Sequence, residues 1–285
     1  MPKKRFFAFI DEAGAKGYIK DLPSNRDTEV AIMAALLVDQ NDHPAIEAAF
    51  RPGYQQFVNA AGSGTLHFTE AFLDPNGAWA TTARQVRQDF FALLLQYKIP
   101  IIYSVIRVDA KRAEHQERTD LIQQLTQERR SAIEVKPPID DSTLETDTFQ
   151  DLLVKVGTFA EDEDAEIDVR LDETSSGVLR SFRRAGEDLK DLGQMVITPT
   201  GYDREAGKPV KGATGKFTLS SSFPVEVTTI KTITVASKTD PLVLAIDGIV
   251  NSLNHHLGKL PPDADLETRV SLKGWVLEPL VQLAP

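Results

Sequence analysis

Three acidic residues stand at positions where a metal-dependent reaction could use them. Asp11 and Asp172 each follow a strand-like run of residues, and Asp247 lies within the apolar stretch 242–250. A carboxylate in an apolar helix is costly to bury unless it is paired or binds a metal ion. Acids at the ends of neighbouring strands converge on one edge of a sheet, so the set indicates a site more strongly than any member does.

A fourth acid, Glu70, follows a loop of small residues at 61–64. Thr69 is placed to cap the turn that would hold Glu70, and His67 would lie on the same side. Each residue also has an ordinary explanation. His67 could be a packed or surface histidine, and Glu70 could be a helix-start acid stabilised by the helix dipole.

The other three acids have ordinary explanations as well. Asp11 could belong to a turn after its strand, and Asp172 with Glu173 could cap the next helix. Asp247 could lie on the one solvated face of its helix, next to Asn251. Their order along the chain, rather than any single position, favours a shared site.

The elements that would position these acids are strands followed by helices. Apolar or alternating runs predict strands at 5–10, 30–38, 100–108, 166–171 and 226–235. Periodic patterns predict helices at 44–60 (broken near Pro52), 81–96, 149–160, 178–192 and 241–256. Because the long strands look buried on both faces, we expect an α/β protein with a mixed sheet flanked by helices.

Two segments do not fit this regular order. Residues 109–147 are highly charged and predict a helical insertion followed by a loop. Residues 199–220 predict a hairpin insertion around a loop at 201–215. We expect residues 1–285 to form a single domain with insertions at about 109–147 and 199–220.

The four acids and their order resemble the ribonuclease H-like superfamily, and more closely the prokaryotic domain-of-unknown-function family numbered 3800. That family usually shows a strand followed by Asp-Glu-Ser-Gly, and here Phe9-Ile10 is followed by Asp11-Glu12-Ala13-Gly14. Ala13 replaces the serine, but the carboxylate is kept. The other matching segments are 67–70, 171–173 and 244–248, so the resemblance runs from about residue 5 to 257 through short motifs.

The resemblance implies a ribonuclease H-like fold with Asp11, Glu70, Asp172 and Asp247 as catalytic metal ligands. Hard carboxylate oxygens suit Mg²⁺ or Mn²⁺. Two such ions, about 3.5–4 Å apart, can activate a water and stabilise the leaving oxygen. Asp11 would bridge the ions, Glu70 and Asp172 would flank one, and Asp247 would flank the other. The candidates to hold these ligands in position through hydrogen bonds are Glu12, His67 and Glu173.

Several basic residues are candidates for nucleic-acid contact. The net charge is −10, so such contact must come from a local basic surface. The candidates are Arg180, Arg183 and Arg184 on the helix after Asp172, and Lys216 in the hairpin insertion. A solvated loop is the ordinary explanation for Lys216.

Composition narrows the class of protein. The chain has 285 residues, is 41% hydrophobic and 26% charged, and contains no cysteine. It therefore has neither a thiolate metal site nor a cysteine nucleophile. No run reaches the roughly 18 apolar residues of a membrane span, and the apolar run near the N-terminus is too short for a signal peptide. We expect a cytoplasmic protein with no membrane association.

The expected function is a Mg²⁺- or Mn²⁺-dependent phosphodiesterase, a nuclease that cleaves DNA or RNA by a two-metal mechanism. Two alternatives stay open. One is a catalytically inactive ribonuclease H-like subunit that binds or regulates. The other is a hydrolase of small phosphoesters. A protein partner or an oligomer is compatible with all three, and nothing in the sequence selects the nucleic acid.

Overall fold

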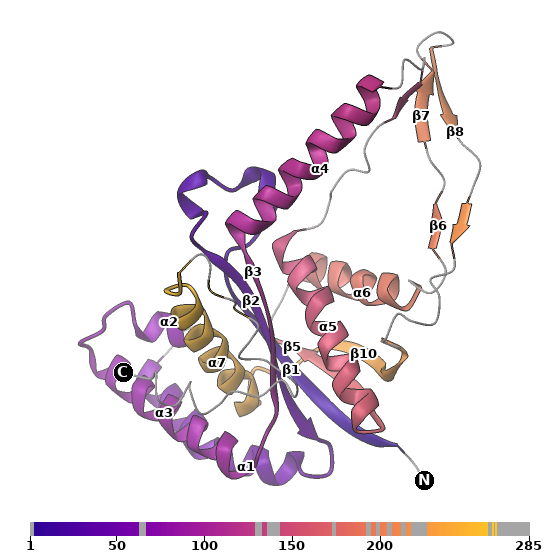
Figure 1. The fold of residues 1–285 in the computed structure, drawn as a ribbon. Coiled ribbons are helices and arrows are strands. Elements are labelled where there is room, and N and C mark those ends of the chain that lie inside the picture. The colour runs from indigo at the N-terminus through magenta and orange to yellow at the C-terminus, as the bar shows by residue number, and fades with distance from the viewer. Residues whose placement is uncertain are drawn as a thin grey trace.

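A computed structural model describes residues 3–62, 67–128, 133–135, 143–172, 175–191, 195–197, 200–203, 207–211, 215–217, 227–261, 264 and 266. Its centre is a five-stranded mixed sheet in the order β10-β5-β1-β2-β3 (Figure 1). The strands are β1 (Lys4–Gly14), β2 (Val30–Asp39), β3 (Ile101–Arg107), β5 (Ala165–Leu171) and β10 (Ile230–Val235). The expectation of an α/β protein with a mixed sheet flanked by helices is confirmed.

The central strand β1 is longer than the sequence suggested. It pairs antiparallel with β2 as far as Gly14, whereas its parallel pairing with β5 ends at Ile10. Asp11 therefore lies inside β1, opposite Ala34, at the level where β5 has ended. The turn explanation of Asp11 is wrong, because the long partner β2 keeps the backbone extended past the acid.

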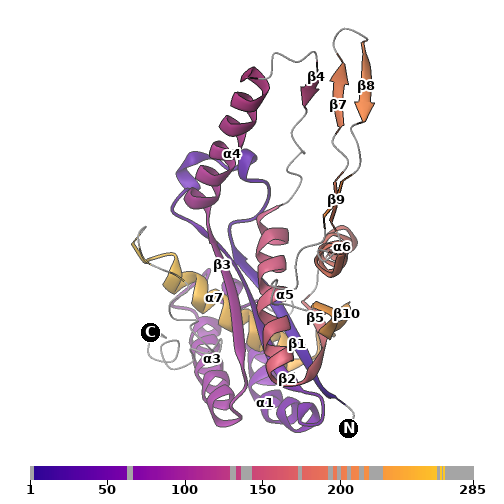
Figure 2. The same cartoon turned by 45° about the vertical axis from the view of Figure 1, so that its right-hand side comes forward.

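Helices cover both faces of the sheet (Figures 1 and 2). One face is covered by α1 (His43–Ala61), α3 (Ala78–Gln96) and α7 (Pro241–Leu257), with the short α2 (Phe68–Ala71) beside them. The other face is covered by α5 (Leu144–Asp162) and α6 (Ser176–Asp191). The side chains of β1 alternate between these two layers, with Phe9 facing the first and Ile10 the second.

The expected break of the first helix at Pro52 is absent. The helix α1 runs through Pro52 to Ala61. Its buried residues Phe50 and Phe57 lie on either side of the proline and are fully enclosed by the core. Apolar packing of this face therefore outweighs the hydrogen bond that proline removes.

An extended arm projects from the sheet and contains most of the described residues of the two expected insertions (Figure 2). The first insertion was expected to run to 147, but α5 already begins at Leu144. The helix α4 (Val108–Glu128) begins the arm, and β7 (Thr200–Asp203) and β8 (Lys208–Lys211) form an antiparallel pair near its end. The short strand β4 (Ile133–Val135) pairs with β7. A separate pair is formed by β6 (Met195–Ile197) and β9 (Gly215–Phe217). Short 3-10 turns are found at Ile19–Asp21, Ser24–Arg26 and Val227–Thr229.

In the ranges given above, no helix is both long enough and apolar enough to cross a bilayer.

Candidate acidic site

The helix α7 brings Asp247 into the core. Asp240 caps its first turn by accepting the Leu242 N–H at 3.0 Å, and Pro241 occupies the first helical position. The apolar run that follows packs against β1 and β2, and Asp247 is only 5% exposed. The explanation that placed Asp247 on a solvated face is therefore wrong.

Asp247 holds the start of α2 from a distant part of the chain. One carboxylate oxygen, Oδ2, accepts the Phe68 N–H at 2.6 Å. The other, Oδ1, accepts from Asn251 Nδ2 at 2.8 Å and lies 3.6 Å from His67 Nδ1. The expected capping role of Thr69 is wrong, because α2 begins one residue earlier and its first N–H is satisfied by Asp247.

Gly248 allows α2 to pack closely on α7. A Cβ at this position would lie 2.9 Å from Phe68 Cε2, which is closer than side-chain carbons approach. Phe68 is completely buried against this glycine. The packing fixes the short helix that holds Glu70 next to the helix that holds Asp247.

Asp11 is buried among other acids. It is 7% exposed, and its Oδ1 accepts the Glu12 N–H at 2.8 Å. Burial raises the pKa of Asp11 well above its usual value, and the charges of Asp247, Glu12 and Asp172 raise it further. A negative charge on Asp11 is thus disfavoured both by burial and by its acidic neighbours.

His67 lies within electrostatic range of the remaining acids. Its hydrogen-bonding interaction with Asp247 raises the pKa of the imidazole, and the charges of Asp247, Asp172 and Glu70 act in the same direction against its partial burial. The structure therefore brings Asp11, Glu70, Asp172 and Asp247 into one electrostatic neighbourhood. His67 lies on the Asp247 side of that neighbourhood.

Asp172 leaves the sheet beside Asp11. Its N–H donates to the Ile10 carbonyl at 3.1 Å, which continues the pairing of β5 with β1 by one residue. The following helix α6 is capped by Ser175, whose Oγ accepts the Val178 N–H at 3.3 Å. The capping explanation of Asp172 is therefore wrong. Glu173, the neighbouring candidate, lies outside the described residues.

Glu12 has a basic partner that the sequence did not reveal. Lys16 Nζ lies 2.9 Å from Glu12 Oε1. Burial lowers the pKa of Lys16, but the charges of Glu12, Asp11 and Glu145 outweigh burial and raise it. Gly14, the last residue of β1, has a positive φ of 88°, and Ala15 still donates to the Val30 carbonyl at 2.8 Å.

The residues predicted to contact nucleic acid lie on α6 and in β9. Arg180, Arg183 and Arg184 are exposed on α6. Arg183 donates to the Ile233 carbonyl at 3.0 Å, and Arg184 lies 3.9 Å from Asp188. Lys216 pairs with Val196 through its main chain, and its side chain is outside the described part of the structure.

The donor set fits a hard divalent cation. Asp11 and Asp247 are buried oxygen donors, and Asp172 and Glu70 add negative charge beside them. As their side chains stand, no group of three or more His, Asp or Glu residues in the described ranges is already arranged to hold a metal ion. Both carboxylate oxygens of Asp247 already accept hydrogen bonds within the protein.

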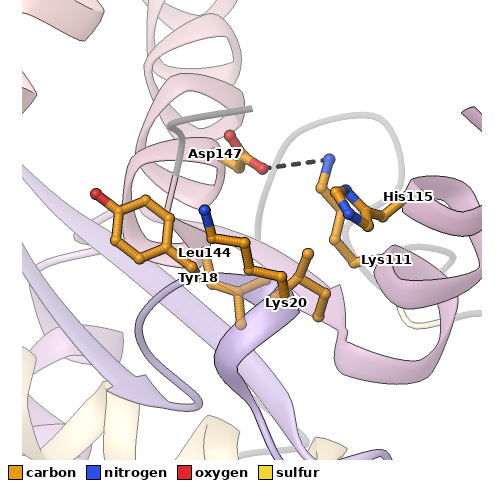
Figure 3. A pocket seen from close by; sticks show the side chains of 7 residues that line it. Tyr18, Lys20, Lys111, His115, Leu144 and Asp147 are labelled. Carbon is orange, nitrogen blue, oxygen red and sulfur yellow. Dashed lines mark ion pairs between the residues drawn. The ribbon is translucent and has the colours of Figure 1, made fainter. Parts of the chain in front are cut away.

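A pocket at the base of α4 is lined by none of the four candidate metal ligands. It is lined by Tyr18, Lys111, His115, Leu144, Asp147 and their neighbours, with Lys111 Nζ 3.2 Å from Asp147 (Figure 3). Its volume is about 10 Å³, enough for about one water molecule. It is therefore too small to be a substrate site.

Comparison with known proteins adds no assignment. No family model matches this chain, and no curated protein matches it.

Proposed function

We propose that this chain is a Mg²⁺- or Mn²⁺-dependent phosphodiesterase of ribonuclease H-like fold that cleaves DNA or RNA. The observation that supports this most is the concentration of acids around buried Asp11. Mutual repulsion of carboxylates is costly in a protein interior, and a divalent cation relieves it. The order of the acids, from a central strand to a helix, a strand end and a late helix, agrees with the resemblance.

The metal would be held by Asp11, Glu70, Asp172 and Asp247. When bound, it would lower the pKa of a coordinated water and stabilise negative charge on the leaving oxygen. The chain's other residues have positioning roles. Asp247 fixes the first turn of α2 through the Phe68 N–H, and so fixes Glu70. His67 and Asn251 orient the Asp247 carboxylate from its other side.

The direct test is cleavage of labelled single- and double-stranded DNA and RNA by purified protein, with Mn²⁺, with Mg²⁺ and with chelator. We expect metal-dependent cleavage that falls at least about a hundredfold in Asp11→Asn and Asp172→Asn. Asp168→Asn is the matched control, because Asp168 lies on the strand that leads to Asp172 but is bound to Arg5, Gln40 and Thr232.

Cleavage at the wild-type rate by both Asp11→Asn and Asp172→Asn would sink the proposal. Absence of cleavage, together with no effect of Mn²⁺ on thermal unfolding, would favour the non-catalytic binding subunit. Turnover of a model phosphodiester without cleavage of any polymer would favour the hydrolase of small phosphoesters.

A further inference from the structure

Two arginines on α3 share one aromatic ring next to the acidic site. The guanidinium carbons of Arg84 and Arg87 lie 5.7 and 5.4 Å from the centre of the Phe72 ring. Phe72 directly follows α2, and α2 contacts both α7 and α3. The two arginines and Asp247 therefore lie on two helices that both pack against α2.

Neither arginine is neutralised by a carboxylate within the residues that the structure describes. Arg84 Nη2 donates to the Pro75 carbonyl at 2.6 Å. Arg87 Nε is buried and has no hydrogen-bond partner there. The nearest acid along the chain, Asp89, accepts a hydrogen bond from Gln85 Nε2 at 2.8 Å instead. Two like charges thus lie together with hydrogen-bond donors to spare.

This arrangement is unfavourable as it stands. Burial lowers the pKa of Arg87, and the charge of Arg84 lowers it further. Contact with the Phe72 ring does not use the N–H donors of the guanidinium groups. A phosphate group accepts such donors in pairs and would neutralise both charges.

Another arginine in this chain shows what a purely structural stack looks like. Arg51 lies over the Tyr54 ring, with its guanidinium carbon 5.6 Å from the ring centre. It also forms an ion pair with Glu47 and donates to the Thr239 carbonyl at 2.5 Å. The donors of Arg51 are satisfied within the protein, whereas a buried donor of Arg87 is not.

We propose that Arg84 and Arg87 form a phosphate-binding subsite for the nucleic-acid strand whose cleaved bond lies at the acidic site. This inference rests on the proposed function. Both sites border the four-residue helix α2, so one bound strand would contact both.

An apolar side chain at the same loop favours a polymer over a free phosphate ion. Leu73 follows Phe72 and is 84% exposed. An exposed leucine beside two phosphate-binding arginines can contact a sugar or a base, which inorganic phosphate lacks. The loop thus offers both kinds of interaction that a strand can make.

Binding is the measurement that tests this inference apart from catalysis. Fluorescence anisotropy of labelled single-stranded and double-stranded DNA and RNA would be followed in chelator, where no metal-dependent cleavage consumes the probe. The double variant Arg84→Gln/Arg87→Gln should weaken binding about tenfold to a hundredfold. The slope of log K against log salt should become shallower by about one for each phosphate that the variant no longer neutralises.

Three further variants separate the causes. Arg51→Gln is the matched control for removing a stacked arginine, and should leave affinity and salt slope unchanged. Arg84→Lys/Arg87→Lys should keep most of the salt slope, because the charge remains while paired hydrogen bonds are removed. Leu73→Ser should weaken binding of the oligonucleotides. It should not change the rise in melting temperature that inorganic phosphate produces.

The possible outcomes separate the subsite from the catalysis. Wild-type affinity and salt slope in a folded Arg84→Gln/Arg87→Gln protein would overturn the subsite even if the chain proves to be a nuclease. Binding of inorganic phosphate but of no oligonucleotide would overturn the polymer assignment. Arginine-dependent binding of an oligonucleotide, without cleavage in any metal, would support the subsite while overturning the proposed catalysis.

Discussion

One aspartate caps the start of α7 and another lies within its buried stretch, and the two differ in what surrounds them. Asp240 and Asp247 are 8% and 5% exposed, and both accept the backbone N–H of a helix start. Each also faces a histidine, with His43 Nε2 3.4 Å from Asp240 and His67 Nδ1 3.6 Å from Asp247. The difference lies in the third neighbour.

Asp240 faces a cation. Arg170 Nη1 lies 3.8 Å from Asp240 Oδ2, and the guanidinium is held in place by stacking on the Phe7 ring, 3.3 Å from its centre. The start of α7 adds its own positive potential. The charge of Asp240 is therefore stabilised by the protein alone.

Asp247 faces other acids instead. It lies close enough to Asp11 to raise that residue's pKa, and Asp172 acts on the same group. Burial and capping are common to both aspartates and do not distinguish them. Asp247 differs because acids rather than an arginine lie beside it, which under the proposed function leaves a place for a cation from solution.

The largest expected difference between variants of Asp240 and Asp247 is in their response to metal. Mn²⁺ at about 100 times its dissociation constant should raise the free energy of unfolding of the wild type by about 2.7 kcal/mol. Asp247→Asn should abolish this stabilisation, whereas Asp240→Asn should keep it. Thermal unfolding with and without Mn²⁺ measures both, and an equal response of the two variants would show that the acids are not a metal site.

The next difference is in stability without metal. Asp240→Asn should lower the free energy of unfolding by about 1–3 kcal/mol, because His43 and Arg170 lose the charge they face. Asp247→Asn should lower it by less, because losing the contacts with Asn251 and His67 is offset by the end of repulsion with Asp11. Urea unfolding in chelator distinguishes them, and a larger decrease in Asp247→Asn would contradict the comparison.

The smallest effect is in the pH dependence of the metal-free protein. Folding raises the pKa of Asp11 above 3.8 and that of His67 above 6.5, so both groups bind protons more tightly when folded. Stability should therefore be greatest below those values and should fall as pH rises through the raised ones.

Single variants separate the two contributions to this profile. Asp11→Asn should flatten the fall that begins near pH 4, and His67→Gln should flatten the part that begins near pH 6.5. Unfolding followed by circular dichroism across pH in chelator would show this. A metal-free stability that rises with pH over the same range would contradict the assigned environments.

Much of the fold could be read from the order of apolar runs. The five strands of the central sheet and the helices that flank it were predicted within a few residues, because period and length are local properties. The exceptions are the length of β1 and the continuity of α1 at Pro52. Both depend on partners elsewhere in the chain, namely β2 and the buried phenylalanines.

The sequence by itself determined which acids are present, their order, and the elements on which they lie. Only the tertiary structure decided that Asp247 caps α2 and that Asp240 is neutralised by Arg170. The same holds for Arg84 and Arg87, which meet at Phe72 without a carboxylate partner in the described part of the chain. The physical reason is that local pattern sets conformation, whereas the energy of a buried charge depends on neighbours that are distant in sequence.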